Sequence, residues 1–109
     1  MNLDIRVEEL ESQKNVFLAG EIDTYTAPKL KETLVPLTEG SGVEVVVDLS
    51  EVQYIDSTGL GVFVGVLKAT DSNDSTLTLV GMSERIKRLF VITGLDEVMN
   101  IVDRGEEAK

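Results

Sequence analysis

The sequence predicts an α/β fold in which helices pack on one mostly parallel sheet of four to five strands. One observation is that extended, β-branched runs alternate along the chain with segments whose apolar residues recur at helical spacing. A second is the run VEVVVDL from Val43 to Leu49, which is almost continuously apolar, as in a central parallel strand buried on both faces. The predicted order is strand, strand, helix, strand, helix, strand, helix and a short last strand, and such alternation favours parallel crossovers.

The first half of the chain predicts a hairpin followed by a helix. Apolar and polar residues alternate from Leu3 to Val7, and after the polar turn ESQKN the run from Val16 to Ile22 repeats an extended pattern. Thr26 is expected to cap a helix in which the early Pro28 needs no amide donor, and Pro36 with the segment TEGSG ends it. The apolar face of this helix consists of Ala27, Leu30, Leu34 and Leu37.

The second half predicts two helices and two strands. A helix is expected from about Thr58 to Thr70, and the segment TLTLV from Thr76 is the next strand. Ser83 is expected to cap a third helix, which Gly94 stops in a left-handed conformation. The run VMNIV from Val98 predicts a short edge strand. The inward residues of the two helices are Leu60, Phe63, Val64 and Leu67, then Ile86, Leu89 and Phe90.

The length of the chain fits one domain. A chain of 109 residues closes one hydrophobic core and is too short for two, so residues 1–109 are expected to form a single domain. The charged tail DRGEEAK, residues 103–109, is expected to be a helical stub or disordered, and it leaves little room for a full final helix.

The composition excludes several classes of function. There are no cysteines and no histidines, which removes thiol catalysis, Ser-His-Asp triads and Cys/His zinc sites. With 20 acidic and 10 basic residues the formal net charge is -10, which disfavours binding to nucleic acid or to anionic membranes. No apolar run approaches membrane-spanning length, and the N-terminus does not resemble a signal peptide, so a cytoplasmic location is expected.

The segment YIDSTGLG, from Tyr54 to Gly61, is the most informative motif. Asp56 and Ser57 follow the central strand and begin the next helix, and functional groups collect at such carboxyl ends of parallel strands. Either residue also suits a helix cap. Capping and a functional role are compatible, so both interpretations stay open.

Other chemistry at this motif is less well supported. The glycines do not match G-x-G-x-x-G, because Val64 occupies the third glycine position, and no Walker loop is present. A catalytic serine needs a base, and the sequence offers no signature of one. A serine at a helix start is nevertheless a suitable phosphoacceptor, since backbone amides tolerate a phosphoryl group of roughly -1.5 to -2 charge. The sequence therefore favours a hydroxyl substrate at this position, either Ser57 or its competitor Thr58, and residue chemistry alone does not separate the two.

Three blocks of the chain resemble a known family. In order, GEIDTYTAPKLKETLVPL, VVVDLSEVQYIDSTGLGVFVGVLK and SERIKRLFVITGL are similar to segments of the anti-sigma factor antagonists, whose fold is the STAS domain. They are most like the antagonist of the general stress response in Gram-positive bacteria. The resemblance implies that Ser57 is the phosphoacceptor and that Asp23 belongs to the surface that meets the kinase.

A folded surface, rather than a linear motif, is expected to recognise the kinase. No Lys or Arg lies within ten residues of Ser57 on either side, so local basic determinants are absent. If the loop Glu21 to Thr26 lies on the same rim as Asp56, the two segments are neighbours. The candidate kinase-binding residues are Asp23, Thr24, Asp56, Thr58, Gly59, Leu60, Gly61, Ser83 and Arg85.

The resemblance implies partner switching. The unphosphorylated protein would bind an anti-sigma factor serine kinase of the GHKL type and free the sigma factor, until phosphorylation of Ser57 abolishes binding and a PP2C-type phosphatase restores it. ATP and magnesium would belong to the kinase, so this chain is expected to be a switch and not an enzyme, with no catalytic residue, cofactor or metal of its own.

Three alternatives remain. The first is a STAS interaction module of another stress-sensing or transporter complex. The second is a receiver-type domain phosphorylated on Asp48, although the acidic pair and the lysine that such domains need are missing. The third, a hydrolase that uses Asp23 and Asp56, rests only on their expected proximity.

Overall fold

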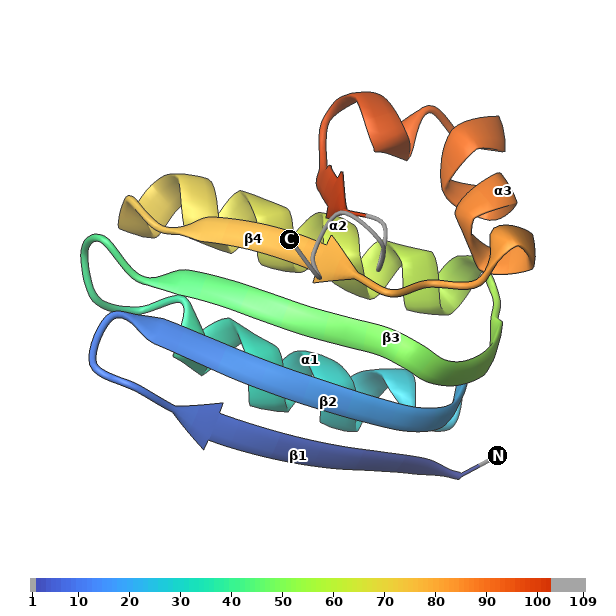
Figure 1. Ribbon diagram of the computed structural model, residues 1–109, viewed down its shortest axis with the longest axis horizontal. Helices are drawn as coiled ribbons and strands as arrows, with labels where there is room; N and C mark the ends of the chain where they lie inside the picture. The colour runs from blue at the N-terminus through green and yellow to red at the C-terminus, as the bar shows by residue number, and fades with distance from the viewer. Residues whose placement is uncertain (1, 103–109) are drawn as a thin grey trace.

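The computed structural model describes residues 2–102, and within them the elements follow the predicted order (Figure 1). The residues of the predicted tail, 103–109, lie outside the described part of the chain. The elements are β1 (Leu3–Glu9), β2 (Gln13–Ile22), α1 (Ala27–Leu37), β3 (Glu44–Ile55), α2 (Ser57–Asn73), β4 (Thr76–Val80), α3 (Glu84–Ile92), the 3-10 helix η1 (Leu95–Glu97) and β5 (Asn100–Val102).

A single five-stranded sheet organises the fold, with the spatial order β1-β2-β3-β4-β5. The hairpin pair β1 and β2 is antiparallel, and every other neighbouring pair is parallel. In the middle of the sheet Val47 pairs with Val16 on one side and with Leu79 on the other. The prediction of one mostly parallel sheet with a central β3 is therefore confirmed, and β5 is the short edge strand.

The helices α1 and α2 pack against each other behind the sheet, while α3 is set apart beyond β4 (Figure 1). Apolar side chains from α1, α2 and α3 form one core with the covered face of the sheet. Phe63 on α2 and Phe90 on α3 are fully buried, and their ring centroids are 6.2 Å apart. This aromatic contact joins α3 to the rest of the core.

Strand β3 is buried on one face and not on both, so that part of the prediction is wrong. Val45, Val47 and Leu49 are fully buried under the helices, whereas Val46 and Asp48 are only half-buried on the opposite face. The reason is that α1 and α2 lie on the same side of the sheet (Figure 1). A run of β-branched residues does not reveal which of its two faces the helices cover.

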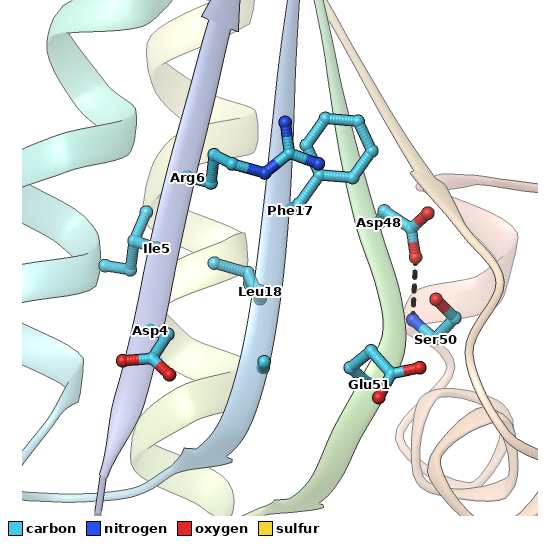
Figure 2. A pocket seen from close by; sticks show the side chains of 9 residues that line it. Asp4, Ile5, Arg6, Phe17, Leu18, Asp48, Ser50 and Glu51 are labelled. Carbon is cyan, nitrogen blue, oxygen red and sulfur yellow. Dashed lines mark hydrogen bonds between the residues drawn. The ribbon is translucent and has the colours of Figure 1, made fainter.

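The other face of the sheet is open and carries mixed side chains. Figure 2 shows Arg6 of β1 reaching over the ring of Phe17 on β2, with its guanidinium carbon 4.1 Å from the ring centroid. Asp48 accepts a hydrogen bond of 2.8 Å from the backbone amide of Ser50. A shallow pocket of about 380 Å³ lies among these residues.

Several predicted boundaries shift. Strand β3 continues past Leu49 to Ile55, and α2 runs from Ser57 to Asn73, where Asp74 adopts a left-handed conformation with φ of 56°. Gly94, with φ of 78°, ends the α3 segment as predicted. Strand β5 begins at Asn100 and not at Val98, because the amides of Val98 and Met99 donate to the carbonyl of Leu95 in the turn that closes η1.

Candidate functional site

The carboxyl ends of β2 and β3 lie side by side at one edge of the sheet, which we call the rim. Ile22 pairs with Ile55 at the ends of the two strands, and the amide of Asp56 donates to the carbonyl of Ile22 over 3.2 Å. The loop that starts at Glu21 and the start of α2 are therefore neighbours, as expected. The parallel strand β4 brings the N-terminus of α3 to the same edge (Figure 1).

Asp56 is the N-cap of α2. Its backbone is extended, with φ of -110° and ψ of -174°, and its carboxylate accepts a hydrogen bond of 3.0 Å from the amide of Gly59. This bond satisfies one of the free amides of the first helical turn. The capping interpretation therefore applies to Asp56 rather than to Ser57.

Ser57 is the first residue of α2 and is exposed. Among residues 2–102 its hydroxyl has no hydrogen-bond partner. A group added to this oxygen would extend into solvent beside the positive end of the helix dipole, where negative charge is stabilised. The fold thus leaves the Ser57 hydroxyl free to react without disturbing an existing bond.

The adjacent hydroxyl of Thr58 is in a different environment. It lies 3.4 Å from the hydroxyl of Thr24, so the two side chains connect the start of α2 to the loop before α1. Modification of Thr58 would break this contact. Residue chemistry alone left Ser57 and Thr58 equivalent, whereas in the structure this contact gives the two hydroxyls different environments.

Asp23 shapes the rim from below its surface. The residue is 7% exposed, and its carboxylate accepts hydrogen bonds from the amides of Tyr25 and Thr26 at 2.9 and 3.0 Å. Thr26, which was expected to cap α1 with its side chain, makes no such bond. Its hydroxyl instead donates to the carbonyl of Glu21 over 2.9 Å. The conformation of this loop therefore depends on Asp23 and Thr26 together.

Two glycines of the motif have opposite surroundings. A Cβ on Gly59 would lie 2.6 Å from a methyl group of Ile22 and 2.8 Å from a side-chain carbon of Ile55, so no larger residue fits. A Cβ on Gly61 would meet nothing within 4 Å, and that residue is exposed. Leu60 between them is 8% exposed and belongs to the core. Of Gly59, Leu60 and Gly61, only Gly61 is exposed to solvent.

The last two predicted residues lie at the start of α3. Ser83 caps this helix, as predicted, by accepting a hydrogen bond of 3.2 Å from the amide of Ile86. Arg85 is exposed.

Two tyrosines at the rim were not predicted. Tyr25 and Tyr54 are exposed, and they border a hollow of about 310 Å³ together with Thr24 and three acidic residues. The acidic residues are Glu21, Asp23 and Asp56. A bulky aromatic at the solvent-facing end of a strand was the signal that could have identified Tyr54.

A second groove lies between the first turns of α1 and α2. It has a volume of about 520 Å³ and is mostly apolar, with Lys31 as its cation. The Gly61 position opens into it. Its lining residues are Thr24, Ala27, Pro28, Lys31, Thr58, Gly61 and Val62.

The structure disfavours a receiver-type site at Asp48. This residue lies in the middle of β3, well before its end at Ile55, and its side chain faces the open side of the sheet. Within residues 2–102 no three potential metal-ligating side chains gather into a cluster. Over the same residues, no helix has the length and apolar character needed to cross a membrane.

The fold and the rim together define a class of protein. The STAS domain family model matches residues 4–108, nearly the whole chain. The chain belongs to the STAS domain family, which confirms the resemblance found in the sequence.

Its relatives within that family are regulators of sigma factors by name. An anti-sigma-B factor antagonist from Listeria monocytogenes is 48% identical over 102 residues, which cover 93% of this chain and 90% of the relative. Another, from Staphylococcus epidermidis, is 48% identical over 109 residues and covers both chains completely. The crystal structure of an anti-sigma factor antagonist from Mycobacterium paratuberculosis has a TM-score of 0.81 and 26% identity, over 92% of this chain and 85% of that chain.

Proposed function

We propose that this protein is an anti-sigma-B factor antagonist that works by partner switching in the cytoplasm. In its unphosphorylated form it binds an anti-sigma factor that is also a serine kinase of the GHKL type, and this releases the sigma factor. The kinase phosphorylates Ser57 and then dissociates, and a PP2C-type phosphatase removes the phosphate. The full-length similarity to anti-sigma-B factor antagonists supports this assignment.

The single observation that supports Ser57 best is its free hydroxyl. It is exposed at the start of α2, and no hydrogen bond within residues 2–102 holds it, unlike the neighbouring hydroxyl of Thr58. The transfer moves the γ-phosphoryl group of ATP from the β-phosphate oxygen to Oγ of Ser57, with loss of the hydroxyl proton. ATP, its metal and the catalytic base belong to the kinase, and this chain contributes the acceptor.

The charge of the rim explains how phosphorylation would release the kinase. Glu21, Asp23 and Asp56 line the hollow beside Ser57, so the rim is already acidic. A phosphoryl group adds roughly -1.5 to -2 charge, and a kinase surface without cations facing Ser57 would desolvate it. We expect repulsion and desolvation to cost at least ~3 kcal/mol, or roughly a hundredfold in affinity.

The kinase contact surface comprises the exposed parts of the rim. Thr24, Ser57, Thr58 and Gly61 present side chains or backbone to solvent, and Ser83 and Arg85 extend this surface to α3. Asp23, Asp56, Gly59 and Leu60 support it from within: they hold the loop, cap the helix and fill the core. The protein acts as a binding partner and a substrate, and no catalysis of its own is needed.

The proposal is tested by incubating the protein with the anti-sigma kinase and Mg-ATP and measuring intact mass, followed by peptide mapping across Gln53 to Lys68. The expected result is one added phosphate on Ser57 that is absent in Ser57→Ala. The matched control is Thr58→Val, which keeps the size of the side chain and should still accept one phosphate. Absence of phosphate with an active kinase, or its transfer to Thr58, would reject the assignment.

A further inference from the structure

The outer edge of β1 is an unpaired edge of the sheet. β1 is the first strand in the order β1-β2-β3-β4-β5, and among residues 2–102 no element lies beyond it (Figure 1). Its inner edge pairs with β2 in a regular antiparallel register from Leu3 to Glu9. A strand with one free edge presents a row of backbone groups on which another strand can add.

The backbone hydrogen bonds of β1 identify the residues that face outward. At one end the carbonyl of Asn2 accepts from the amide of Glu21 over 2.8 Å, and at the other the amide of Leu10 donates to the carbonyl of Gln13 over 2.9 Å. Hydrogen-bonded and non-hydrogen-bonded pairs alternate along an antiparallel ladder, so the even-numbered residues from 2 to 10 bond to β2. The amides and carbonyls of the odd-numbered residues therefore point away from the sheet. Within the strand these residues are Leu3, Ile5, Val7 and Glu9.

The side chains at this edge differ between the two faces of the sheet. Leu3, Ile5 and Val7 are half-buried and pack against the core on the helix-covered face. Asp4 and Arg6 are exposed on the open face, where charges of opposite sign follow each other along the strand. The edge thus carries an incompletely covered apolar row on one face and a row of alternating charge on the other.

We propose that a second copy of this chain pairs with the outer edge of β1, antiparallel and centred on Ile5, so that two five-stranded sheets join into one. The hydrogen-bonded pairs of this ladder are Ile5 with Ile5, and Leu3 with Val7 of the other copy. A two-fold axis perpendicular to the sheet keeps the helices of both copies on the same face, so the apolar rows meet there. This inference does not depend on the proposed partner switching.

Charge complementarity favours a second copy in this register. With Ile5 opposite Ile5, Asp4 of each copy lies opposite Arg6 of the other, in a non-hydrogen-bonded pair, where facing side chains are closest. Arg6 also stacks on Phe17, with its guanidinium carbon 4.1 Å from the ring centroid (Figure 2). Stacking occupies the face of the planar guanidinium and leaves its in-plane N–H groups able to donate to a carboxylate. The chain itself therefore supplies the complement of its own edge.

The two adjacent registers bring like charges together. Centring the pair on Arg6 apposes the two Arg6 side chains and places Asp4 opposite Glu8. Centring it on Asp4 apposes two carboxylates. Like charges directly opposite each other destabilise a strand pair. In the register centred on Ile5, by contrast, Glu8 lies opposite the uncharged side chain of Asn2.

A register centred on Val7 satisfies the charges but not the apolar row. It pairs Arg6 with Glu8 of the other copy, which is attractive. It also places the apolar Ile5 opposite the exposed Glu9, whose carboxylate already bonds to Lys14 over 2.9 Å. Of these four registers, only the one centred on Ile5 matches charge with opposite charge and apolar with apolar side chains.

The interface is small, so the dimer should be weak. A contact limited to Leu3–Val7 buries less than the ~1,200–2,000 Å² of a stable specific interface, and each copy has a net charge of -10. At about 0.15 M salt the Debye length is ~8 Å, which screens the long-range repulsion between copies more than ion pairs in contact. We expect a dissociation constant on the order of 100 μM under these conditions.

The test measures self-association of the full-length, unphosphorylated protein by sedimentation equilibrium. The variants are Asp4→Arg, Arg6→Asp and the double exchange Asp4→Arg/Arg6→Asp, which restores opposite charges in the register centred on Ile5. Asp71→Arg, at an exposed position of α2, is the matched control, since it changes the net charge as Asp4→Arg does. Thermal unfolding confirms that each variant is folded.

We expect Asp4→Arg and Arg6→Asp each to weaken the dimer at least about tenfold, because the cross-strand pairs become repulsive. The double exchange should return the dissociation constant to within about threefold of that of the parent. Asp71→Arg should leave it within about threefold. Asp4→Arg lowers the magnitude of the net charge, so weakening in this variant cannot come from repulsion between whole copies.

Amide hydrogen exchange reports on the register independently. As the protein concentration rises from about 50 μM to about 1 mM, exchange at the outward amides of Leu3, Ile5 and Val7 should slow. Exchange at the amides of Asp4 and Arg6, which bond to β2, should change less.

A parent protein that stays monomeric at about 1 mM, or a dimer that the double exchange fails to restore, would overturn the inference. A dimer that Ile92→Ser abolishes and Asp4→Arg leaves intact would overturn it as well, because the contact would then lie at the exposed apolar end of α3. Phosphorylation of Ser57 by the kinase is measured in a separate assay, so these outcomes leave the proposed function untouched.

Discussion

The segment from Tyr54 to Gly61 contains both exposed residues of the rim and buried residues that support the rim. The exposed residues are available for partner contact, and the buried ones contribute to folding. Ser57, Thr58 and Gly61 are open to solvent, whereas Gly59 and Leu60 between them are packed against the core. At the start of a helix, neighbouring residues point in different directions, so the segment from Asp56 to Gly61 serves both partner contact and folding. A signature of this kind marks a site without telling which of its residues touch the partner.

The largest effect is expected at the exposed position itself. Ser57→Asp places a permanent charge in the proposed interface, and we expect it to lower kinase affinity by about a hundredfold, or ~3 kcal/mol. The stability of the variant should change by less than about 0.5 kcal/mol, since the side chain is at the surface. Ser57→Ala should keep full affinity and resist release by kinase and ATP. Calorimetric titration with the kinase measures the affinity of both variants. Equal affinities for Ser57→Asp and Ser57→Ala would contradict the proposal that charge at position 57 releases the kinase.

The next effect concerns the buried support. Gly59→Ala forces a methyl group to within 3 Å of Ile22 and Ile55, and such overpacking costs about 1–3 kcal/mol of stability. The urea unfolding midpoint of the variant should fall, with the slope unchanged. A midpoint equal to that of the parent would show that Ile22 and Ile55 move to accommodate the methyl group, and that the lack of space does not require glycine at position 59.

Loss of the α2 cap is expected to have a smaller effect. Asp56→Ala removes the carboxylate that accepts the Gly59 amide, which should lower stability by about 1 kcal/mol. Asp56→Ser, which retains a capping oxygen, is the matched control and should recover most of the loss. If Asp56→Ala and Asp56→Ser lose the same stability, the Asp56 carboxylate does not stabilise the protein by capping α2.

The last effect on stability, which has the opposite sign, is expected at the exposed glycine Gly61. Gly61→Ala adds a methyl group in open space within a helix, so stability should rise by up to about 1 kcal/mol. Kinase affinity should fall severalfold, because the methyl group projects into the groove beside Thr58. A Gly61→Ala variant that is more stable but binds the kinase more weakly would assign Gly61 to the contact surface. A Gly59→Ala variant that is less stable would assign Gly59 to the packing of the core. Unchanged affinity would remove Gly61 from the contact surface.

The sequence predicted the order of the elements because apolar periodicity and caps are local. The spacing identified Phe63, Ile86 and Phe90 as buried residues, and Ser83 caps α3 as its position suggests. On α2 the predicted face was partly wrong, because Val64 and Leu67 are half-buried whereas Val62 and Val66 are buried. Burial of β3 on both faces was wrong because alternation of equally apolar residues carries no information about which face helices cover. The 3-10 turn η1 had no distinct sequence signal, so the start of β5 was predicted two residues too early.

The site was predicted in position and less well in detail. The carboxyl-edge rule located Asp56 and Ser57, but only the packing distinguishes residues that contact solvent from those that support the surface. Asp23 illustrates this, because its buried carboxylate binds two loop amides. Hydrogen bonds between segments far apart in the chain, such as that of Thr24 with Thr58, have no signature in a single sequence. Such a contact also gives the hydroxyls of Ser57 and Thr58 different environments.

The most direct test of partner switching is the affinity of the kinase for the protein before and after stoichiometric phosphorylation of Ser57. Titration calorimetry with both forms at the same salt concentration gives the ratio of the two dissociation constants. The account predicts a ratio of at least about a hundred, with an unchanged unfolding midpoint for the phosphorylated protein. A ratio near one would contradict it, because the phosphate would then have no effect on the choice of partner.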